Sequence, residues 1–493
     1  MANRSEIIKG SFWSYLGQAT ALAISLATSI ILARLLDKDN WGLFATLMAV
    51  VSFTSTIADL GLNYSIIHKA SSSSNKSSGA IRRLLSVPLR YKLALILMLG
   101  ALMFVFSNEL AAFFNIADGG KYFAVSAAFF VVYNFTSMLD LVFIGLKKFR
   151  ESSLLFVVHA LFRITFSYIL VTIGFGVNGA VLGYISAVAV LALLQIVIIR
   201  KYVSFTEDSG EDVVEMFTYG FYFGIGNLAA YIALWTDSIV IGALIGTTAV
   251  GIYRIGLSIS SAVGGLTGII SKVLFPMFSS AESNNKESIG DLNTAIKYGS
   301  FIAFPAVIGL IISAESIILA FFGGQYIEGV LSLMILSYVP FDMMFTGIIS
   351  AYLAAKKHTK VVGYTAILAS IANFVMNLML IPVVGIAGAA LASVLTRIGN
   401  AAYLIHWLQK NVKVNVDVGA MSLPLIGSVL MGLLLFVAKP LIDPTYSVIH
   451  LIIFVVFGMA SYAIIEQLLG FDVVSFTRKI GKVVLPPSIA RRL

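Results

Sequence analysis

The sequence of 493 residues contains no cysteine, only five histidines and few charged side chains. The lack of cysteine excludes disulfides, thiolate metal sites and cysteine nucleophiles. Charged residues make up 12% of the chain, whereas about 25% is usual in soluble domains. No glycine-rich nucleotide loop, HExxH motif or metal-ligand spacing is present. We therefore expect neither an enzyme active site nor a cofactor, and we do not expect this chain to hydrolyse ATP.

Hydrophobic residues instead account for 59% of the chain, compared with about 45–50% in soluble domains. They form long unbroken runs, such as 93–106 and 181–199. Strands of a membrane β-barrel would alternate apolar and polar residues over about 10 positions. The runs therefore predict an all-α integral membrane protein.

A helix needs about 20 mostly apolar residues to cross the hydrocarbon core. By this criterion the sequence predicts about fourteen transmembrane helices. They are residues 11–36, 41–67, 86–107, 122–146, 152–173, 178–199, 217–245, 248–275, 297–320, 329–355, 361–382, 386–408, 419–439 and 446–469. The first run lacks a small-residue cleavage site, so we interpret it as a retained helix.

The net charge of +9 predicts the orientation of these helices. Lysine and arginine collect in the short cytoplasmic loops of membrane proteins. With the N-terminus in the cytoplasm, most basic residues fall on that side, including the pair Lys147–Lys148 and the tail after residue 477. We expect a multi-pass protein of the cell (inner or plasma) membrane with both termini cytoplasmic. The positive charge then needs no nucleic-acid partner.

Short features recur at a constant offset of 209 residues. The matching pairs are Ser29–Ile30 with Ser238–Ile239, Gly42 with Gly251, Lys147–Lys148 with Lys356–Lys357, and Gly176, Gly179, Ala180 and Leu182 with Gly385, Gly388, Ala389 and Leu391. The offset superimposes helices one to six on helices seven to twelve, so the two halves share one orientation. Transporters are often built from such repeats, with the substrate near the midplane between them.

The repeat predicts two pseudo-symmetric six-helix lobes followed by two further helices. The expected parts are an N-lobe over residues 1–200, a cytoplasmic linker over 201–216, a C-lobe over 217–410, and helices thirteen and fourteen with a cytoplasmic tail over 411–493. Two tandem bundles with a purely structural role are the alternative.

Four short motifs near the N-terminus resemble those of the polysaccharide transporter family. They are Gly10–Ser11–Phe12–Trp13, Ala33–Arg34–Leu35–Leu36, Trp41–Gly42–Leu43–Phe44 and Asp59–Leu60–Gly61–Leu62. This family contains the Wzx-like flippases within the multidrug/oligosaccharidyl-lipid/polysaccharide exporter superfamily. The resemblance implies two lobes around a cavity that opens alternately to each side. It also implies transfer of a polyprenyl-(pyro)phosphate-linked oligosaccharide to the outer leaflet. Without ATP hydrolysis, transport must draw either on an ion gradient, with a sodium ion or a proton as coupling ion, or on the gradient of the lipid substrate itself. Glycan assembly enzymes are candidate partners.

Two arginines are expected near mid-membrane, Arg163 and Arg397. A charge that stays at this depth usually faces a cavity or a partner. Arginine can hold phosphate oxygens in bidentate fashion, so we predict that both bind the substrate, together with His159 one turn before Arg163. The alternative is a buried ion pair with Asp140 or Asp342, and a packing role for His159.

Five further charged residues are candidates for ion coupling or gating: Asp342, Asp237, Asp140, Arg34 and Asp59. Asp342 follows Pro340, and a proline that kinks a helix would leave carbonyls beside the carboxylate for a cation or proton. A counter-ion role toward Arg397 is equally compatible. Arg34 and Asp59 belong to the family-like motifs near helix ends, which favours a structural or gating role over substrate binding.

Helix seven carries a polar-aromatic stripe that includes Asn227, Tyr231 and Trp235. Their spacing places them on one helical face, where the rings would stack on sugars of the substrate. The alternative is packing between helices through small residues.

Three classes of function remain. The sequence favours a flippase of lipid-linked oligosaccharides. An ion-coupled multidrug antiporter of the same superfamily would have the same architecture. A membrane polymerase or ligase of glycans is disfavoured, because every outward loop is short, the longest being about 107–121.

Overall fold

The computed structural model describes residues 20, 22–59, 61–72, 77–200, 202–205, 231–280, 285–414, 416–442, 446–471 and 473, with the side chains of 269–280 and 285–288 excepted. Within these ranges the chain forms helices and no strands. Eleven of the helices are long and apolar enough to cross a membrane, and two shorter apolar helices cover Leu22–Leu35 and Tyr231–Leu244. The protein is thus an all-α, multi-pass membrane protein, as the hydrophobic runs predicted, while the number fourteen stays a prediction.

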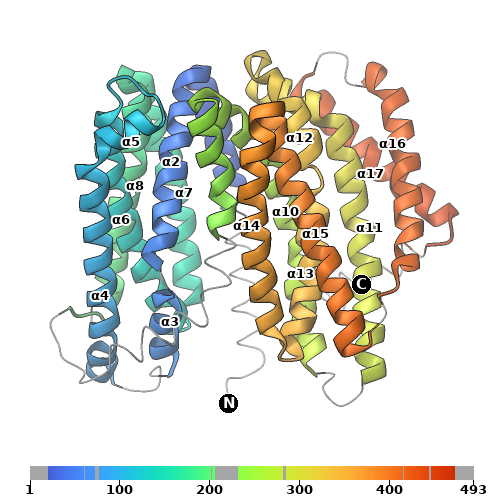
Figure 1. The fold of residues 1–493 in the computed structure, drawn as a ribbon, viewed down its shortest axis with the longest axis horizontal. Coiled ribbons are helices and arrows are strands. Elements are labelled where there is room, and N and C mark those ends of the chain that lie inside the picture. Colours follow the sequence, from blue (N-terminus) through green and yellow to red (C-terminus); the bar gives the residue numbers. More distant parts are fainter. Residues whose placement is uncertain are drawn as a thin grey trace. The chain divides into compact units, whose positions relative to one another are not determined.

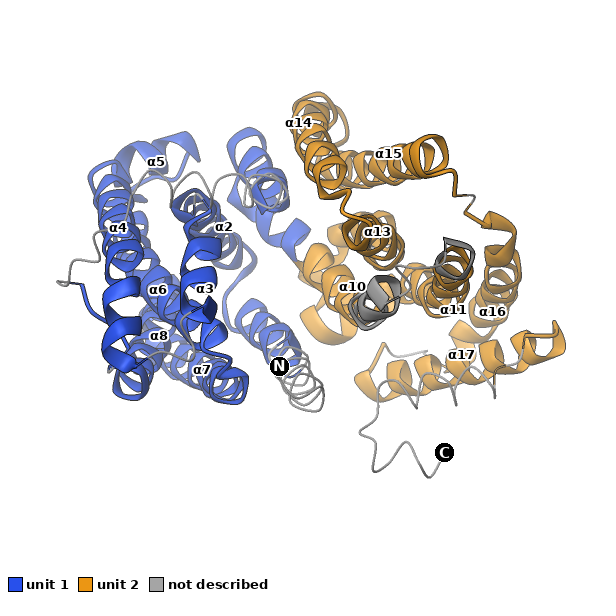
Figure 2. Cartoon of the chain, turned by 90° about the horizontal axis from the view of Figure 1, so that it is seen from below, with its two compact units in different colours: residues 1–254 blue, residues 255–493 orange. Residues whose placement is uncertain are grey.

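The chain divides into two compact units, Met1–Arg254 and Ile255–Leu493 (Figure 2). The division falls inside α10 (Thr247–Ser280), whereas the repeat predicted a boundary over 201–216, of which only 202–205 are described. The two lobes therefore remain a prediction, and each unit is described by itself below.

Unit 1 is a bundle in which the long helices run side by side (Figure 1). Its helices include α2 (Lys38–Asp59), α3 (Leu62–Ser72), α4 (Ser78–Val105), α5 (Ser107–Phe113), α6 (Gly120–Gly145), α7 (Phe149–Leu170), η1 (Val171–Phe175) and α8 (Gly176–Ile199). Helix α6 is central, since α2, α3, α4, α5, α7 and α8 all pack against it.

Polar residues before the helices explain several of their starts. Asp37 precedes α2, and its carboxylate accepts a 2.8 Å hydrogen bond from the Asn40 backbone N–H. Ser77 and Ser447 cap α4 and α17 in the same way. Such caps satisfy backbone donors that a helix start leaves free.

The predicted helices over 152–173 and 178–199 form a hairpin, α7 and α8, that reverses at Val171–Gly176. Gly176 has φ 52° and ψ −133° at this reversal. In unit 2, the hairpin of α14 (Thr359–Val384) and α15 (Ile386–Val412) reverses at Gly385 with φ 66° and ψ −142°. A positive φ favours glycine. Two glycines 209 positions apart thus adopt the same unusual backbone, each at the turn between two helices that pack along one another.

Among its described residues, unit 2 contains the rest of α10 and ten further helical segments (Figure 1). They are α11 (Asn285–Ile317), η2 (Ile318–Phe322), η3 (Gly324–Gly329), α12 (Val330–Leu336), α13 (Val339–Ala355), α14, α15, η4 (Val418–Met421), α16 (Ser422–Ile442) and α17 (Val448–Leu468). Two apolar clusters hold it together. One joins α11, α13 and α15 around Ile348 and Leu404, and the other joins α11, α16 and α17 around Phe301 and Phe454.

The tenth predicted helix is interrupted before Pro340. Helix α12 ends at Leu336, and α13 starts at Val339 with Pro340 in its first turn. Proline is tolerated there because its missing N–H would have no partner within the helix. Asp342 consequently lies in the first turn of α13 rather than in mid-helix.

Candidate functional site

Arg163 projects from α7 into an aromatic environment within unit 1. Its guanidinium carbon lies 5.2 Å from the centre of the Tyr184 ring on α8, and its charge also acts on Tyr133 of α6. Tyr184 in turn makes edge contacts with Phe44 and Phe129 at 5.3 and 5.7 Å between ring centres. We call Arg163, Tyr133 and Tyr184 the cation–aromatic cluster.

Arg163 forms no hydrogen bond or ion pair with any residue that the structure describes, and its Nε atom is buried without a partner. Asp140, the carboxylate proposed for an ion pair with it, instead accepts a 2.7 Å hydrogen bond from Ser152 Oγ. His159 is buried one turn before Arg163, close enough to feel its charge, and its Nε2 atom also lacks a partner. The two residues thus lie side by side on α7, and their role in substrate binding stays a prediction.

The polar-aromatic stripe is only partly within the described chain, because Asn227 lies outside it. Tyr231 is exposed and close enough to Tyr133 to interact electrostatically. Trp235 differs, since the guanidinium of Arg254 lies over its ring at 4.1 Å. One face of Trp235 is therefore already occupied.

Asp237 is buried in a network with α10. The Tyr253 hydroxyl donates a 2.5 Å hydrogen bond to Asp237 Oδ2, and Arg254 is close enough to act on it electrostatically. This carboxylate is thus satisfied by neighbours from its own unit.

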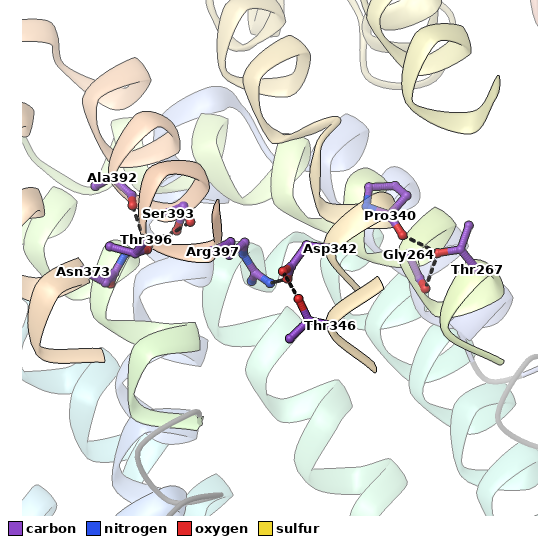
Figure 3. A network of polar contacts seen from close by, with 10 residues as sticks. All are labelled: Gly264, Thr267, Pro340, Asp342, Thr346, Asn373, Ala392, Ser393, Thr396 and Arg397. Atoms are coloured by element: carbon purple, nitrogen blue, oxygen red, sulfur yellow. Dashed lines mark hydrogen bonds and ion pairs between the residues drawn. The ribbon is translucent and has the colours of Figure 1, made fainter. Parts of the chain in front are cut away.

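In unit 2, Arg397 and Asp342 form an ion pair between α15 and α13 (Figure 3). The Arg397 guanidinium donates to Asp342 Oδ2 at 2.6 Å, and Thr346 Oγ1 donates to Asp342 Oδ1 at 2.7 Å. Asp342 is 7% exposed and Arg397 30% exposed. The counter-ion interpretation of Asp342 is the one that the structure bears out.

Polar contacts on both sides fix the helices that carry this pair (Figure 3). Thr267 Oγ1 of α10 donates to Pro340 O at 2.7 Å, so this carbonyl is occupied rather than free for a cation. On the other side, Asn373 of α14 lies 3.4 Å from Ser393 Oγ of α15 and Asn377 donates to Asn373. The ion pair is held between helices that are themselves cross-linked.

The remaining motif residues lie near helix ends. Arg34 is exposed on Leu22–Leu35. Asp59 ends α2, accepts a 3.1 Å hydrogen bond from the Asn63 backbone N–H, and lies 3.9 Å from Lys92 Nζ on α4. The Lys92 ammonium also donates to the Asn63 side chain.

Lys92 is a buried charged residue that the sequence analysis did not single out. The structure places it on a membrane-spanning helix at 3% exposure. Its position inside the expected helix 86–107 was the available signal, because a buried lysine requires an acidic or polar partner.

The fold is that of a polytopic membrane protein, and comparisons with known proteins agree. A model described as "Polysaccharide biosynthesis protein" matches residues 31–331, and one described as "Lipid II flippase MurJ" matches residues 221–457. The first covers more than half of the chain, so the chain belongs to the polysaccharide biosynthesis protein family.

Individual relatives are distant but nearly full-length. A probable low-salt glycan biosynthesis flippase, Agl15 of Haloferax volcanii, is 23% identical over 88% of this chain and 90% of the relative. The solved lipid II flippase MurJ, in an inward closed conformation, has a TM-score of 0.75 at 17% identity, over 94% of this chain and 99% of that one. An inward-facing multidrug resistance MATE family transporter of the MOP superfamily has a TM-score of 0.63 at 17% identity, over 80% and 94%. These structures share the fold.

Proposed function

We propose that the protein is a flippase that moves a polyprenyl-(pyro)phosphate-linked oligosaccharide from the cytoplasmic to the outer leaflet by alternating access. The observation that carries the proposal is the state of Arg163, a partly buried cation whose Nε atom is buried without a partner and which has no counter-ion among the described residues. A charge at the bilayer centre costs about 2.5–3.5 kcal/mol on insertion scales. An anion brought by the substrate would supply the missing compensation.

The chemistry of the cation–aromatic cluster fits such a substrate. Arginine binds phosphate oxygens through two parallel N–H donors, and tyrosine rings offer flat apolar faces with a polar hydroxyl. Arg163 would hold the phosphate, while Tyr133, Tyr184 and the exposed Tyr231 would contact the sugars. His159 would orient Arg163 or donate a second hydrogen bond. Membership of the polysaccharide biosynthesis family and the similarity to a glycan flippase support this assignment.

Asp342 and Arg397 are assigned to ion coupling rather than to substrate binding. Their charges compensate each other at 2.6 Å, so Arg397 does not need a substrate anion. A sodium ion or a proton that bound Asp342 would release Arg397 and change the packing of α13 on α15. We place the protein in the cell membrane with cytoplasmic termini and expect enzymes of glycan assembly as partners, because of the basic loops and the family.

A drug antiporter is the second candidate, favoured by the fold similarity to the MATE transporter. Cationic drugs need acidic sites, whereas the charge in unit 1 that lacks a counter-ion among the described residues is the positive charge of Arg163. This charge favours the flippase over the antiporter.

The test uses the full-length protein in proteoliposomes that contain a fluorescent lipid-linked oligosaccharide. A membrane-impermeant quencher added outside reports how fast the labelled headgroup changes leaflet. We expect transfer that depends on the protein, and no efflux of ethidium from the same vesicles under a sodium or proton gradient. Ethidium efflux without headgroup transfer would overturn the flippase assignment in favour of the antiporter.

A further inference from the structure

Glu466 is a buried carboxyl group in unit 2 that the proposed transport site does not use. It lies in the last turn of α17 with 0% exposure. Neither carboxylate oxygen meets the geometry of a hydrogen bond with a described residue, although the Tyr462 hydroxyl lies close enough to interact with the carboxyl group. Other intramembrane carboxylates differ in this respect, since Asp342 binds Arg397 and Asp237 accepts from Tyr253.

The neighbouring helix α16 is shaped to receive this carboxyl group. A Cβ atom built on Gly427 would overlap Glu466 Oε1, so the carboxyl group occupies the space beside the glycine that a side chain would otherwise take. Tyr462, one turn earlier in α17, and the buried Ser428 border the same space. The Ser428 hydroxyl is already engaged, as it donates to Pro424 O at 2.6 Å. We call Glu466, Gly427 and Tyr462 the carboxyl cradle.

Among the residues that the structure describes, no positive charge is paired with Glu466. The elements that pack against α17 are α11, α16 and η2. Their charged residues with described side chains are Asp291, Lys297 and Glu315 on α11 and Lys439 on α16. Lys439 is bound to Glu315 at 2.9 Å, and Lys297 lies over the Phe471 ring. On α17 itself, the other titratable groups are His450, which contacts Ser447, and Tyr462.

Two physical effects therefore disfavour an ionised Glu466. Burial of a carboxylate without a counter-ion costs far more than burial of the neutral acid. The last turn of a helix also carries a partial negative charge from its free carbonyl groups, which repels an anion and favours a proton. Both effects act in the same direction at this position.

We propose that Glu466 is a proton-binding site, protonated at neutral pH while α17 packs on α16. Release of the proton would leave an anion in the cradle, so proton exchange is linked to separation of Glu466 from Gly427. The site lies on the two helices that follow the repeat, which makes it distinct from the pair Asp342–Arg397. The proposal does not depend on glycan transfer and is tested without it.

Infrared spectroscopy of the purified full-length protein tests the proton directly, because a protonated carboxyl has a C=O stretching band that a carboxylate lacks. We expect the wild type to show this band at neutral pH, to lose it progressively as pH rises, and to lack the Glu466 component in a Glu466→Gln variant. Glu315→Gln is the matched control, because Glu315 is partly exposed and bound to Lys439, and its band pattern should equal that of the wild type.

Two results would overturn the proposal. One is a wild-type spectrum without a protonated-carboxyl band at neutral pH, an observation that needs no variant. The other is a band that stays unchanged in Glu466→Gln, which would assign it to another residue. A Gly427→Ala variant tests the cradle, since the added methyl group must displace the carboxyl and shift or weaken the band. An unchanged band in that variant would contradict the packing on Gly427.

Discussion

Thr248 Oγ1 donates a 2.6 Å hydrogen bond to Asp39 Oδ1, and these residues are 209 positions apart, the offset of the repeat. Gly42 and Gly251 have the same separation and also touch, since a Cβ on Gly251 would lie 2.8 Å from Gly42 Cα. Trp41 Nε1 donates to Gly251 O at 3.1 Å. Within unit 1, the starts of α2 and α10 therefore contact each other through residues that the predicted repeat pairs.

The absence of native cysteine allows a direct test of this contact. In a double variant, Asp39→Cys with Thr248→Cys, we expect a disulfide to form under mild oxidation, because the two side chains already touch. In an alternating-access cycle this contact would be made in one state and broken in another. Oxidation should therefore stop headgroup transfer in proteoliposomes, and a reductant should restore it.

Each single cysteine variant is the control for the double variant. Neither can form an intramolecular disulfide, so oxidation should leave the transfer rate of both unchanged. Transfer that continues at full rate through a completed cross-link would show that the contact persists throughout the cycle.

Replacement of Arg163 should lower the rate of transport without lowering the stability of the fold. Arg163→Ala removes a cation that has no hydrogen-bond or ion-pair partner in the described chain and only the Tyr184 ring beside it, so the protein should insert and unfold thermally much like the wild type. Headgroup transfer should fall at least tenfold, because loss of one charged hydrogen bond costs about 1.5–3 kcal/mol. Arg163→Lys should recover part of the rate, since lysine keeps the charge without the bidentate geometry.

Arg83→Ala is the matched control for Arg163, because Arg83 is exposed on α4. Its transfer rate should equal that of the wild type. Wild-type transfer by Arg163→Ala would remove the cation–aromatic cluster from the mechanism.

Loss of the ion pair in unit 2, unlike replacement of Arg163, should lower the stability of the protein. Arg397→Ala leaves the nearly buried Asp342 without its cation, and such losses cost about 3 kcal/mol or more. In the double variant Asp342→Asn with Arg397→Ala, no uncompensated charge remains, so thermal stability should return toward the wild type. Thermal unfolding of the four proteins in a double-mutant cycle measures the coupling.

The pair Lys148–Glu151 provides the comparison, because it is more exposed at 28% and 43%. Its coupling should be about 0–1 kcal/mol. Additive effects at Asp342 and Arg397 would mean that the two charges do not depend on each other.

Helix positions were predictable from the sequence because hydrophobicity is a local property. The observed helices α6, α7, α8, α14 and α15 begin and end at most four residues from the ends of the expected ranges. The pairs of side chains that contact each other across helices were not predictable in the same way. Arg397 and Asp342 are 55 positions apart, and both a substrate role and an ion pair were compatible with their spacing.

Two features depended on tertiary structure. The break before Pro340 arises where Thr267 binds the Pro340 carbonyl, a contact across 73 positions. The cradle of Glu466 requires that Gly427 face it from another helix. Hydropathy along the chain carries no information on either contact.

Lys92 provides the final prediction, since its burial was unexpected. Lys92→Met keeps the length of the side chain but leaves Asp59 and the Asn63 side chain without their cation near the junction of α2 and α3. An unsatisfied buried polar group costs about 1–3 kcal/mol, so thermal unfolding should occur at a lower temperature. Arg90→Met on the exposed side of α4 should change stability by no more than about 0.5 kcal/mol. Equal stability of the two variants would show that Lys92 contributes nothing through Asp59, and that the α2–α3 junction is held by backbone contacts alone.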